Sequence, residues 1–310
     1  MAKTMLRIAT RKSPLARWQA NHVASLLKQH WPQLHIELVP MVTSGDRFNK
    51  EALSKIGGKG LFVKELEEAL LDKRADFAVH SMKDVPASFP EGLFLAAICE
   101  RQNPSDALLC RGYPNFAALP KGAIVGTSSL RRQSQLLAAR PDLTIKPLRG
   151  NIDTRIKKLQ SEDYHAIVLA AAGLIRLKME TEITEILSTD LMLPACGQGA
   201  IGIECRIEDE ALQAYLKPLN DPLSAICVNT ERKVNALLGG NCHVPLAVYC
   251  MPLINEELLL RANVGSLDGQ ITISNSQRGH QNEATTLANA CSNALLASGA
   301  DDLLANSSTS

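Results

Sequence analysis

A chain of 310 residues, 45% hydrophobic and 21% charged, has the length of two or three soluble domains with apolar cores. Its formal net charge of +1 provides no global field that would attract nucleic acid or an anionic membrane, so any anion must be recognised by local clusters of arginine and lysine. The first twelve residues lack the core of a signal peptide, and no apolar stretch approaches the ~20 residues of a membrane span, so we expect a cytoplasmic protein without a membrane partner.

Strand-like and helical runs alternate from the N-terminus to about residue 205, which is typical of α/β layers. At the first junction between strand and helix, Ser13 is the expected N-cap and Pro14 takes the first helical position. The sequence predicts strands at residues 6–10, 36–42 and 76–80, and helices from residue 14 and at 64–71.

The same order of elements begins again near residue 107. Irregular stretches at residues 99–104 and 194–199 flank this second set, and a further strand is expected at 200–205. Two crossings between two α/β units predict a hinged cleft. The expected elements of the second set are strands at 123–125, 143–148 and 166–171 and helices at 130–139 and 152–159.

The pattern changes after Asp221-Pro222, where a small α+β domain is expected. Its predicted elements are a helix at 223–238, strands at 244–249, 258–264 and 269–274, a helix at 283–297 and a frayed tail at 306–310. We therefore predict three domains, formed by residues 1–99 with 200–217, by 105–193 and by 222–310.

Eight cysteines occur without a CxxC pair, and the seven histidines have no ligand spacing, so we expect neither a disulfide framework nor a metal site. Cys99, Cys110 and Cys205 lie in apolar, strand-like runs and are expected to pack inside. Cys242 differs because it follows Gly240-Asn241 in a loop, where a ligand can reach it. Spacing alone still favours an inert thiol there.

The segment from His80 to Pro86 carries the sharpest chemical signal. Pro86 forbids continuation as a central strand, so the polar residues leave the sheet at a strand end, where open α/β folds bind ligands. Asp84 is a single acid beside Lys83, in a chain whose other candidate site residues are mostly arginine. A carboxylate among cations suits a reaction that develops positive charge while holding a polyanionic substrate.

A candidate anion site lies between the strand at 123–125 and the next helix, where hydroxyl groups and two guanidiniums meet the helix start. It consists of Thr127, Ser128, Ser129, Arg131 and Arg132. The alternative is an N-cap followed by a solvated arginine pair. Similar junctions of strand, cap and arginine occur at Arg149, Gly150 and Arg155, and at Arg11 before Ser13.

The glycine-rich loop that carries Lys55 and Lys59 does not match the phosphate-binding P-loop pattern. The chain between Ser44 and Gly60 has few apolar residues, which suggests a mobile lid. A plain surface loop fits equally well.

Taken together, these segments resemble the porphobilinogen deaminase (hydroxymethylbilane synthase) family nearly end to end. The family usually has glycine before the loop cysteine, where this chain has Asn241. The matching motifs are residues 6–16, 57–65, 80–86, 126–132, 148–151, 193–194 with 197–200, and the Cys242 loop.

The resemblance implies two α/β domains like those of a type II periplasmic binding protein around a cleft, and a small α+β third domain. It implies a dipyrromethane cofactor held by a thioether to Cys242, and porphobilinogen as the small-molecule substrate. Four porphobilinogens would be joined head to tail with loss of ammonia, and hydroxymethylbilane would be released by water. A monomer is implied, with no nucleic acid as partner.

Carried onto this chain, the family's site falls into two groups. The cofactor-binding residues would be Cys242, Ser81, Lys83, Asp84, Thr127, Ser128, Ser129, Arg131, Arg132 and Arg155. The substrate-binding residues would be Arg11, Ser13, Gln19, Lys55, Lys59, Phe62, Arg149, Gly150, Arg155, Arg176 and Gln198.

Asp84 is the expected catalytic residue, because it would stabilise the cation left by loss of ammonia and help to move protons. Two alternatives remain. A non-catalytic anion-binding module would use the same caps and arginines but leaves Asp84 and Cys242 without roles. A nucleic-acid binder using Arg131, Arg132 and Arg140 is opposed by the balanced charge and by only 4% aromatic residues.

Overall fold

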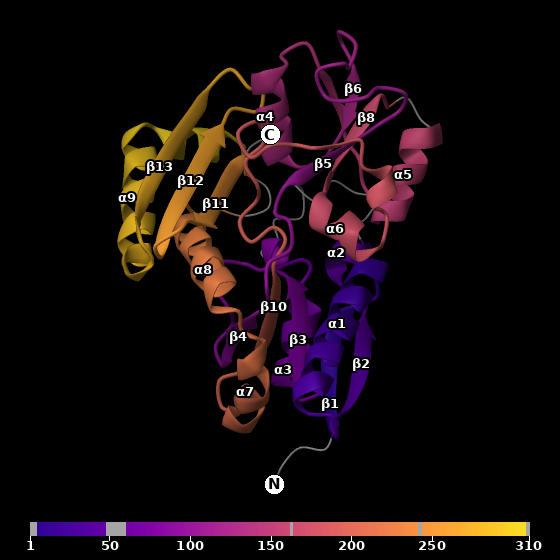
Figure 1. The fold of residues 1–310 in the computed structure, drawn as a ribbon, viewed down its shortest axis with the longest axis vertical. Helices are drawn as coiled ribbons and strands as arrows, with labels where there is room; N and C mark the ends of the chain where they lie inside the picture. Colours follow the sequence, from indigo (N-terminus) through magenta and orange to yellow (C-terminus); the bar gives the residue numbers. More distant parts are fainter. Residues whose placement is uncertain (1–4, 48–59, 162–163, 241–243, 308–310) are drawn as a thin grey trace. The chain divides into compact units, whose positions relative to one another are not determined.

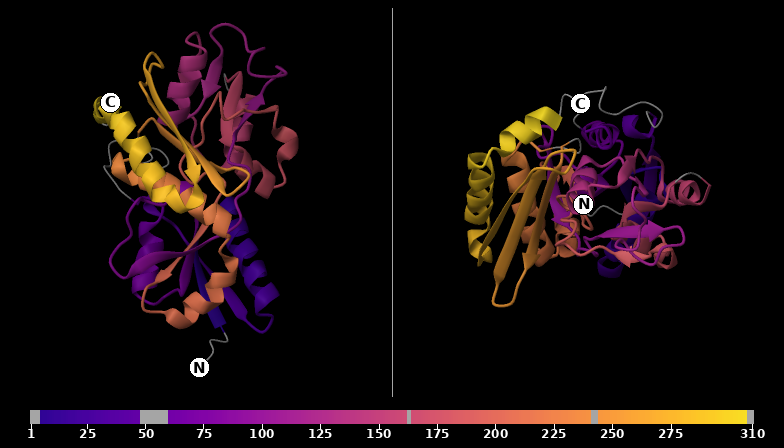
Figure 2. Two further views of the ribbon diagram at one scale, coloured as in Figure 1. Left: turned by 60° about the vertical axis from the view of Figure 1, so that its left-hand side comes forward. Right: turned by 90° about the horizontal axis from the view of Figure 1, so that it is seen from above.

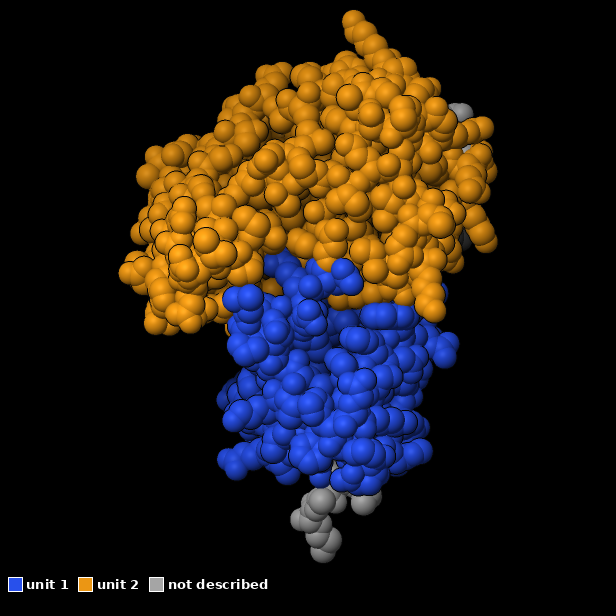
Figure 3. Space-filling view, viewed as in Figure 1, with its two compact units in different colours: residues 1–102, 200–225 blue, residues 103–199, 226–310 orange. Residues whose placement is uncertain are grey.

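The computed structural model describes residues 5–47, 60–161, 164–240 and 244–307 (Figure 1). The chain forms two compact units, residues 1–102 with 200–225 and residues 103–199 with 226–310 (Figure 3). It therefore passes between the units three times, twice next to the irregular stretches that the sequence predicts as connectors and once more between residues 225 and 226. The division into three domains stays a prediction.

The sheet of the first unit has the strand order β2-β1-β3-β10-β4 (Figure 1). β1 pairs in parallel with β2 and β3, whereas β10 is antiparallel to both β3 and β4. The strands are β1 (Met5–Arg11), β2 (His35–Met41), β3 (Phe77–Ser81), β4 (Leu93–Ile98) and β10 (Ile201–Arg206). The helices are α1 (Pro14–His30), α2 (Ser44–Arg47), α3 (Lys64–Leu71) and α7 (Glu210–Leu216).

Apolar side chains cover both faces of this sheet, as a central α/β sheet requires. Ile8 and Phe77 pack with Val23 of α1, whereas Ala78 packs with Leu66 of α3. The helix α1 begins as predicted, because the Ser13 side chain accepts a hydrogen bond from the Ala16 N–H and Pro14 follows it. Among the described residues, no helix has the length and apolar character needed to cross a membrane.

The first sheet of the second unit has the order β7-β6-β8-β5-β9. β6 pairs in parallel with β7 and β8, and β5 is antiparallel to β8 and β9. The strands are β5 (Asp106–Cys110), β6 (Ile124–Gly126), β7 (Thr144–Lys146), β8 (Ala166–Ala170) and β9 (Glu185–Ile186). The helices are α4 (Leu130–Ala139), α5 (Ile152–Ser161) and α6 (Ala171–Arg176).

These two sheets share one plan. In each, a parallel trio is followed by an antiparallel strand and then by an edge strand. The antiparallel strand is β10 in one sheet and β5 in the other. β5 is the first strand after the chain enters the second unit, and β10 is the first strand after it returns to the first unit. This arrangement confirms the expected pair of type II α/β sheets.

The remaining sheet belongs to the second unit and has the antiparallel order β11-β12-β13. Figure 2 shows α9 lying along one face of this sheet, where Leu295 of α9 shares a core with Val248 and Leu260. The sheet and its helices confirm the small α+β portion. The elements are β11 (Leu246–Pro252), β12 (Glu257–Gly265), β13 (Thr272–His280), α8 (Pro222–Leu237), α9 (Ala284–Ala297) and α10 (Ala300–Ser307).

The predicted tail at 306–310 is wrong for its first two residues, because α10 extends to Ser307, and residues 308–310 lie outside the described residues. Asp301 and Asp302 in its first turn favour a helix start, and Leu304 joins the core around α9. The structure also contains short 3₁₀ helices, namely η2 (Met82–Asp84), η3 (Glu180–Glu182), η4 (Lys217–Leu219) and η5 (Gln281–Glu283).

Candidate active site

The buried strand β3 ends at Ser81 and passes directly into η2, which carries Lys83 and Asp84. The Val85 N–H donates to the Met82 carbonyl at 3.1 Å, and the Met82 N–H donates to the Ala200 carbonyl at 3.0 Å. The polar residues therefore leave the sheet at the carboxyl end of β3, as the proline at position 86 predicts.

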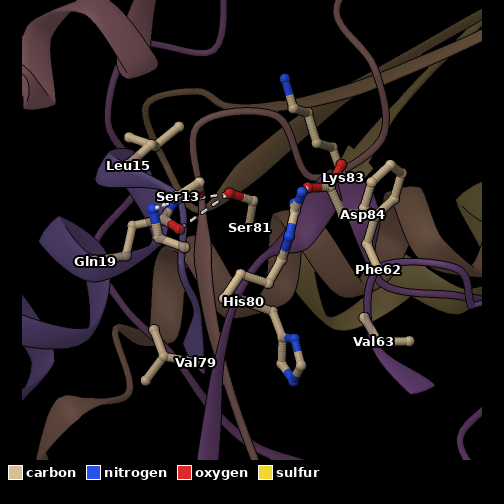
Figure 4. Close-up of a pocket in the computed structure, with 12 residues that line it drawn as sticks. Ser13, Leu15, Gln19, Phe62, Val63, Val79, His80, Ser81, Lys83 and Asp84 are labelled. Atoms are coloured by element: carbon tan, nitrogen blue, oxygen red, sulfur yellow. Dashed lines mark hydrogen bonds and ion pairs between the residues drawn. The ribbon is translucent and has the colours of Figure 1, made fainter. Parts of the chain in front are cut away.

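A pocket at this strand end lies wholly within the first unit (Figure 4). Figure 4 shows Gln19 and Ser81 facing each other, and the Gln19 Nε2 donates to Ser81 Oγ at 2.8 Å. Gln19 is buried, so this bond fixes the Ser81 hydroxyl. The whole lining comes from three segments of the unit, two of which carry Gln19 and Ser81, and its other residues are Arg11, Ser13, Leu15, Ala16, Phe62, Val63, Val79, His80, Lys83 and Asp84.

Arg11 and Asp84, which both line this pocket, form an ion pair with 3.7 Å between Nη1 and Oδ2. Their side chains are 21% and 31% exposed, so a ligand can reach both. The Arg11 guanidinium also lies 4.4 Å from the centre of the Phe62 ring, a cation–π contact. The structure thus brings Arg11, Phe62 and Asp84 together from three separate segments.

Sequence reasoning missed a buried titratable cluster behind the pocket. His80 Nε2 lies 2.8 Å from Glu204 Oε2, and both side chains are almost fully buried. Burial, the Glu204 charge and the charge of Glu68 raise the pKa of Glu67 on α3 to about 7, although His80 acts in the opposite direction. A carboxylate within the apolar strand at 200–205 was the signal in the sequence that could have revealed this cluster.

The hydroxyl groups in the loop before α4 form hydrogen bonds within the loop, with the start of α4 and with Leu148. Ser129 caps the helix by accepting from the Arg132 N–H at 3.4 Å, and Thr127 Oγ1 accepts from the Ser129 N–H at 3.2 Å. Ser128 Oγ donates to the Leu148 carbonyl and accepts from the Leu148 N–H, which joins this loop to the end of the neighbouring β7 segment. The predicted N-cap is confirmed.

Arg131 and Arg132 are buried, so the alternative of a solvated arginine pair is wrong. Both guanidiniums pair with Asp106, a residue to which the sequence analysis gave no role. Arg132 also donates to the Val168 carbonyl at 2.9 Å. The contact of Arg132 with a cofactor stays a prediction.

The other candidate residues of the second unit lie in three places. Gly150 has a φ of +116°, which favours glycine, and its carbonyl accepts from Arg155 Nε at 2.7 Å. Arg176 donates to the Gly199 carbonyl at 2.7 Å. Gln198 Nε2 donates to Asp106 Oδ1 at 3.0 Å. Arg149 is half-buried beside Gly150.

Several expectations fall outside the described residues. Lys55, Lys59, Asn241 and Cys242 belong to the parts of the chain that the structure does not describe, so the lid and the thioether attachment stay predictions. Of the other cysteines, Cys99 and Cys205 are buried as expected, and Cys110 is half-buried. The described residues contain no group of side chains that could hold a metal ion.

Comparison with known proteins shows the family to which this chain is similar. Residues 6–214 match the family described as porphobilinogen deaminase, dipyromethane cofactor binding domain, and residues 225–297 match porphobilinogen deaminase, C-terminal domain. Proteins named porphobilinogen deaminase from two Legionella pneumophila strains, Paris and Philadelphia 1, are each 59% identical over 304 residues, which are 98% of this chain and 98% of the relative.

Among solved structures, the methionine binding protein MetQ is similar to this chain at 11% identity and a TM-score of 0.44, over 74% of this chain and 95% of MetQ. The sheets and the matches over nearly the whole chain define an α/β enzyme. The chain belongs to the porphobilinogen deaminase family. The alternative of a non-catalytic anion-binding module is not favoured.

Proposed function

We propose that this chain joins four porphobilinogen molecules head to tail on a dipyrromethane primer attached through a thioether to Cys242. Ammonia is released at each addition, and hydroxymethylbilane is released by water at the end. The observation that carries the site assignment is the single carboxylate of Asp84, paired with Arg11 at the carboxyl end of β3. We further propose that the chain acts as a monomer in the cytoplasm.

The arginines suit the charge of the growing product. Each porphobilinogen brings an acetate and a propionate, so the chain on the enzyme gains two negative charges per addition. Guanidinium groups bind carboxylates with two parallel hydrogen bonds, which fixes direction as well as energy. The residues proposed for this task are Arg11, Arg131, Arg149, Arg155 and Arg176.

The described residues fit an anionic cofactor. Arg131 is buried, and its Nε makes no hydrogen bond within the described part of the chain. A buried donor without a partner costs about 1–3 kcal/mol, so a ligand carboxylate at this position is favourable. When bound, dipyrromethane supplies the nucleophilic pyrrole carbon at which the product grows. Ser81, Lys83, Thr127, Ser128, Ser129, Arg131, Arg132 and Arg155 are the residues proposed to hold it.

Asp84 is the proposed catalytic residue. Loss of ammonia leaves a cation on the incoming porphobilinogen, and guanidinium groups would disfavour that cation. The Asp84 carboxylate stabilises it and accepts pyrrole N–H hydrogen bonds. Its exposed fraction of 31% leaves it open to the ligand, while the ion pair with Arg11 fixes its position. The same carboxylate can receive the proton that leaves the ring after each substitution.

Porphobilinogen itself is proposed to bind through residues around the same pocket. Arg11, Ser13, Gln19 and Phe62 line it in the first unit. The other residues proposed to bind the substrate are Lys55 and Lys59, which lie outside the described residues, and Arg149, Gly150, Arg155, Arg176 and Gln198.

Intact-mass measurement of the purified chain tests the attachment. We expect the mass of the polypeptide plus one dipyrromethane for the wild type, and the bare polypeptide mass for Cys242→Ser. Cys110→Ser is the control, because this half-buried thiol lies in β5 and should leave the added mass unchanged. An active wild-type protein with the bare polypeptide mass would refute the proposal.

A further inference from the structure

Asp106, the first residue of β5, lies at the centre of a buried charge cluster. Its Oδ2 is 2.8 Å from Arg131 Nη1. Its Oδ1 is 3.0 Å from Arg132 Nε and 2.8 Å from Arg132 Nη2. Gln198 Nε2 donates to the same Oδ1 at 3.0 Å. One carboxylate therefore contacts three side chains that sequence reasoning had placed at the site.

The same cluster ties both connectors of the second unit together. Gln198 also donates to the Pro104 carbonyl at 2.7 Å, which joins the second connector to the first. Arg131 Nη1 donates to the Leu193 carbonyl at 2.7 Å. The direction of the Arg131 side chain is thus set by its pairing with Asp106 and by the backbone of the segment that leads into the second connector.

The charges of the cluster do not balance. Burial raises the pKa of Asp106, but Arg131 and Arg132 outweigh it and hold the pKa below its ordinary value, so Asp106 carries a negative charge. Two buried guanidiniums therefore face one carboxylate. Since a buried charge is costly without a counterion, the surplus favours an anion at the cluster. Arg131 has the buried Nε without a hydrogen bond among the described residues, so it is the donor available to that anion.

We propose that Asp106 is a positioning residue for cofactor retention. It neutralises one of the two guanidiniums, orients Arg131 so that the remaining positive charge meets a cofactor carboxylate, and fixes Gln198 of the second connector to the same point. This inference rests on the proposed function, because it takes the anion to be a carboxylate of dipyrromethane.

Asp106→Asn tests this role, because it keeps the shape of the side chain and removes its charge. We expect a folded protein in which the cofactor-bearing fraction, measured by intact mass, falls well below that of the wild type. In the fraction that retains the cofactor, we expect kcat/KM for porphobilinogen to fall about 10²-fold, the typical cost of a displaced binding group.

Leu136→Ala provides the matched control for lost stability. Leu136 is buried in α4, the helix that carries both arginines, and its truncation costs about 2–5 kcal/mol without touching the charge cluster. We expect this variant to retain the cofactor mass at the wild-type fraction. If Asp106→Asn retains the cofactor as well as Leu136→Ala does, the positioning role is refuted.

Asp106→Glu keeps the test decisive if Asp106→Asn does not fold. It preserves the buried charge but displaces the carboxylate by one methylene, so a folded protein with a reduced cofactor-bearing fraction is expected. Wild-type retention in Asp106→Glu would overturn the proposal. A wild-type protein without cofactor mass would instead refute the proposed function, so the two failures are distinguishable.

Discussion

Arg11 and Asp84 approach within 3.7 Å although one ends β1 and the other ends η2, and they form an ion pair in the lining of the pocket at the end of β3. The ion pair keeps the Asp84 carboxylate in a pocket whose basic residues, Arg11 and Lys83, suit anionic ligands. Both side chains stay partly exposed, so a ligand can reach both charges.

Asp84→Asn should retain the tethered cofactor and lose most of its turnover. The amide keeps the shape of the side chain but cannot stabilise a cation, and removal of one such electrostatic group costs about 10²–10³ in kcat. Steady-state kinetics together with intact mass checks both expectations. Asp72→Asn, at an exposed site beside Arg74, should have wild-type kcat. Normal turnover by Asp84→Asn would exclude the catalytic role.

Arg11→Lys should separate binding from chemistry. Lysine keeps the positive charge near Asp84 but loses the planar fork that pairs with a carboxylate and stacks on Phe62. We expect KM for porphobilinogen to rise about 10-fold or more, with a smaller change in kcat. Arg17→Lys, on the exposed side of α1, is the control. An unchanged KM in Arg11→Lys would argue against substrate binding by this residue.

The raised pKa of Glu67 predicts a specific pH dependence of stability. Because the folded-state pKa of about 7 lies above the ordinary value of 4.5, the native state binds the extra proton, and the free energy of unfolding falls as the pH rises from about 4.5 through 7. Glu67→Gln should remove this loss of stability. The difference in free energy of unfolding between Glu67→Gln and the wild type should therefore increase between pH 5 and 8 by on the order of 1–3 kcal/mol, in favour of the variant.

Urea unfolding of both proteins across that pH range measures the difference. Glu91→Gln is the control, since this side chain is exposed and does not contribute to the pKa of Glu67. Parallel pH profiles for the wild type and Glu67→Gln would contradict the expectation.

Gly269→Ala should weaken the packing of the β12–β13 turn on α4. A Cβ at this position would lie 2.3 Å from the Ala138 N and 2.5 Å from the Leu137 C, and this backbone cannot easily shift. Gln133 Nε2 donates to the Leu267 carbonyl at 3.0 Å in the same contact. We expect a loss of about 1–3 kcal/mol from overpacking, in addition to backbone strain at a φ of +74°.

Gly122→Ala is the control that measures the backbone strain without the overpacking. Gly122 has a φ of +75°, almost the same as Gly269, but nothing lies within 4 Å of its added Cβ. Thermal unfolding should therefore show a clearly larger loss for Gly269→Ala than for Gly122→Ala. Equal losses would mean that the close approach to α4 does not contribute.

Local sequence patterns predicted much of the fold. The helices at 64–71 and 130–139 have the predicted bounds, because apolar periodicity and end signals lie within the element itself. The strand β4 and the helix α7 were missed. The neighbour of β4 in the sheet is β10, more than a hundred residues later, so its pairing left no local signal.

The site divides in the same way. Local sequence is sufficient to predict that β3 ends before Pro86, that Ser13 and Ser129 begin helices, and that Asp84 is an acid among basic residues, because backbone geometry and charge depend on neighbouring residues. The pairing of Asp106 with Arg131 and Arg132, and the contact of Glu204 with His80, become visible in the folded chain alone. Those pairings join residues 25 to 124 positions apart, and the order of the strands, which no local pattern encodes, sets which charges are buried together.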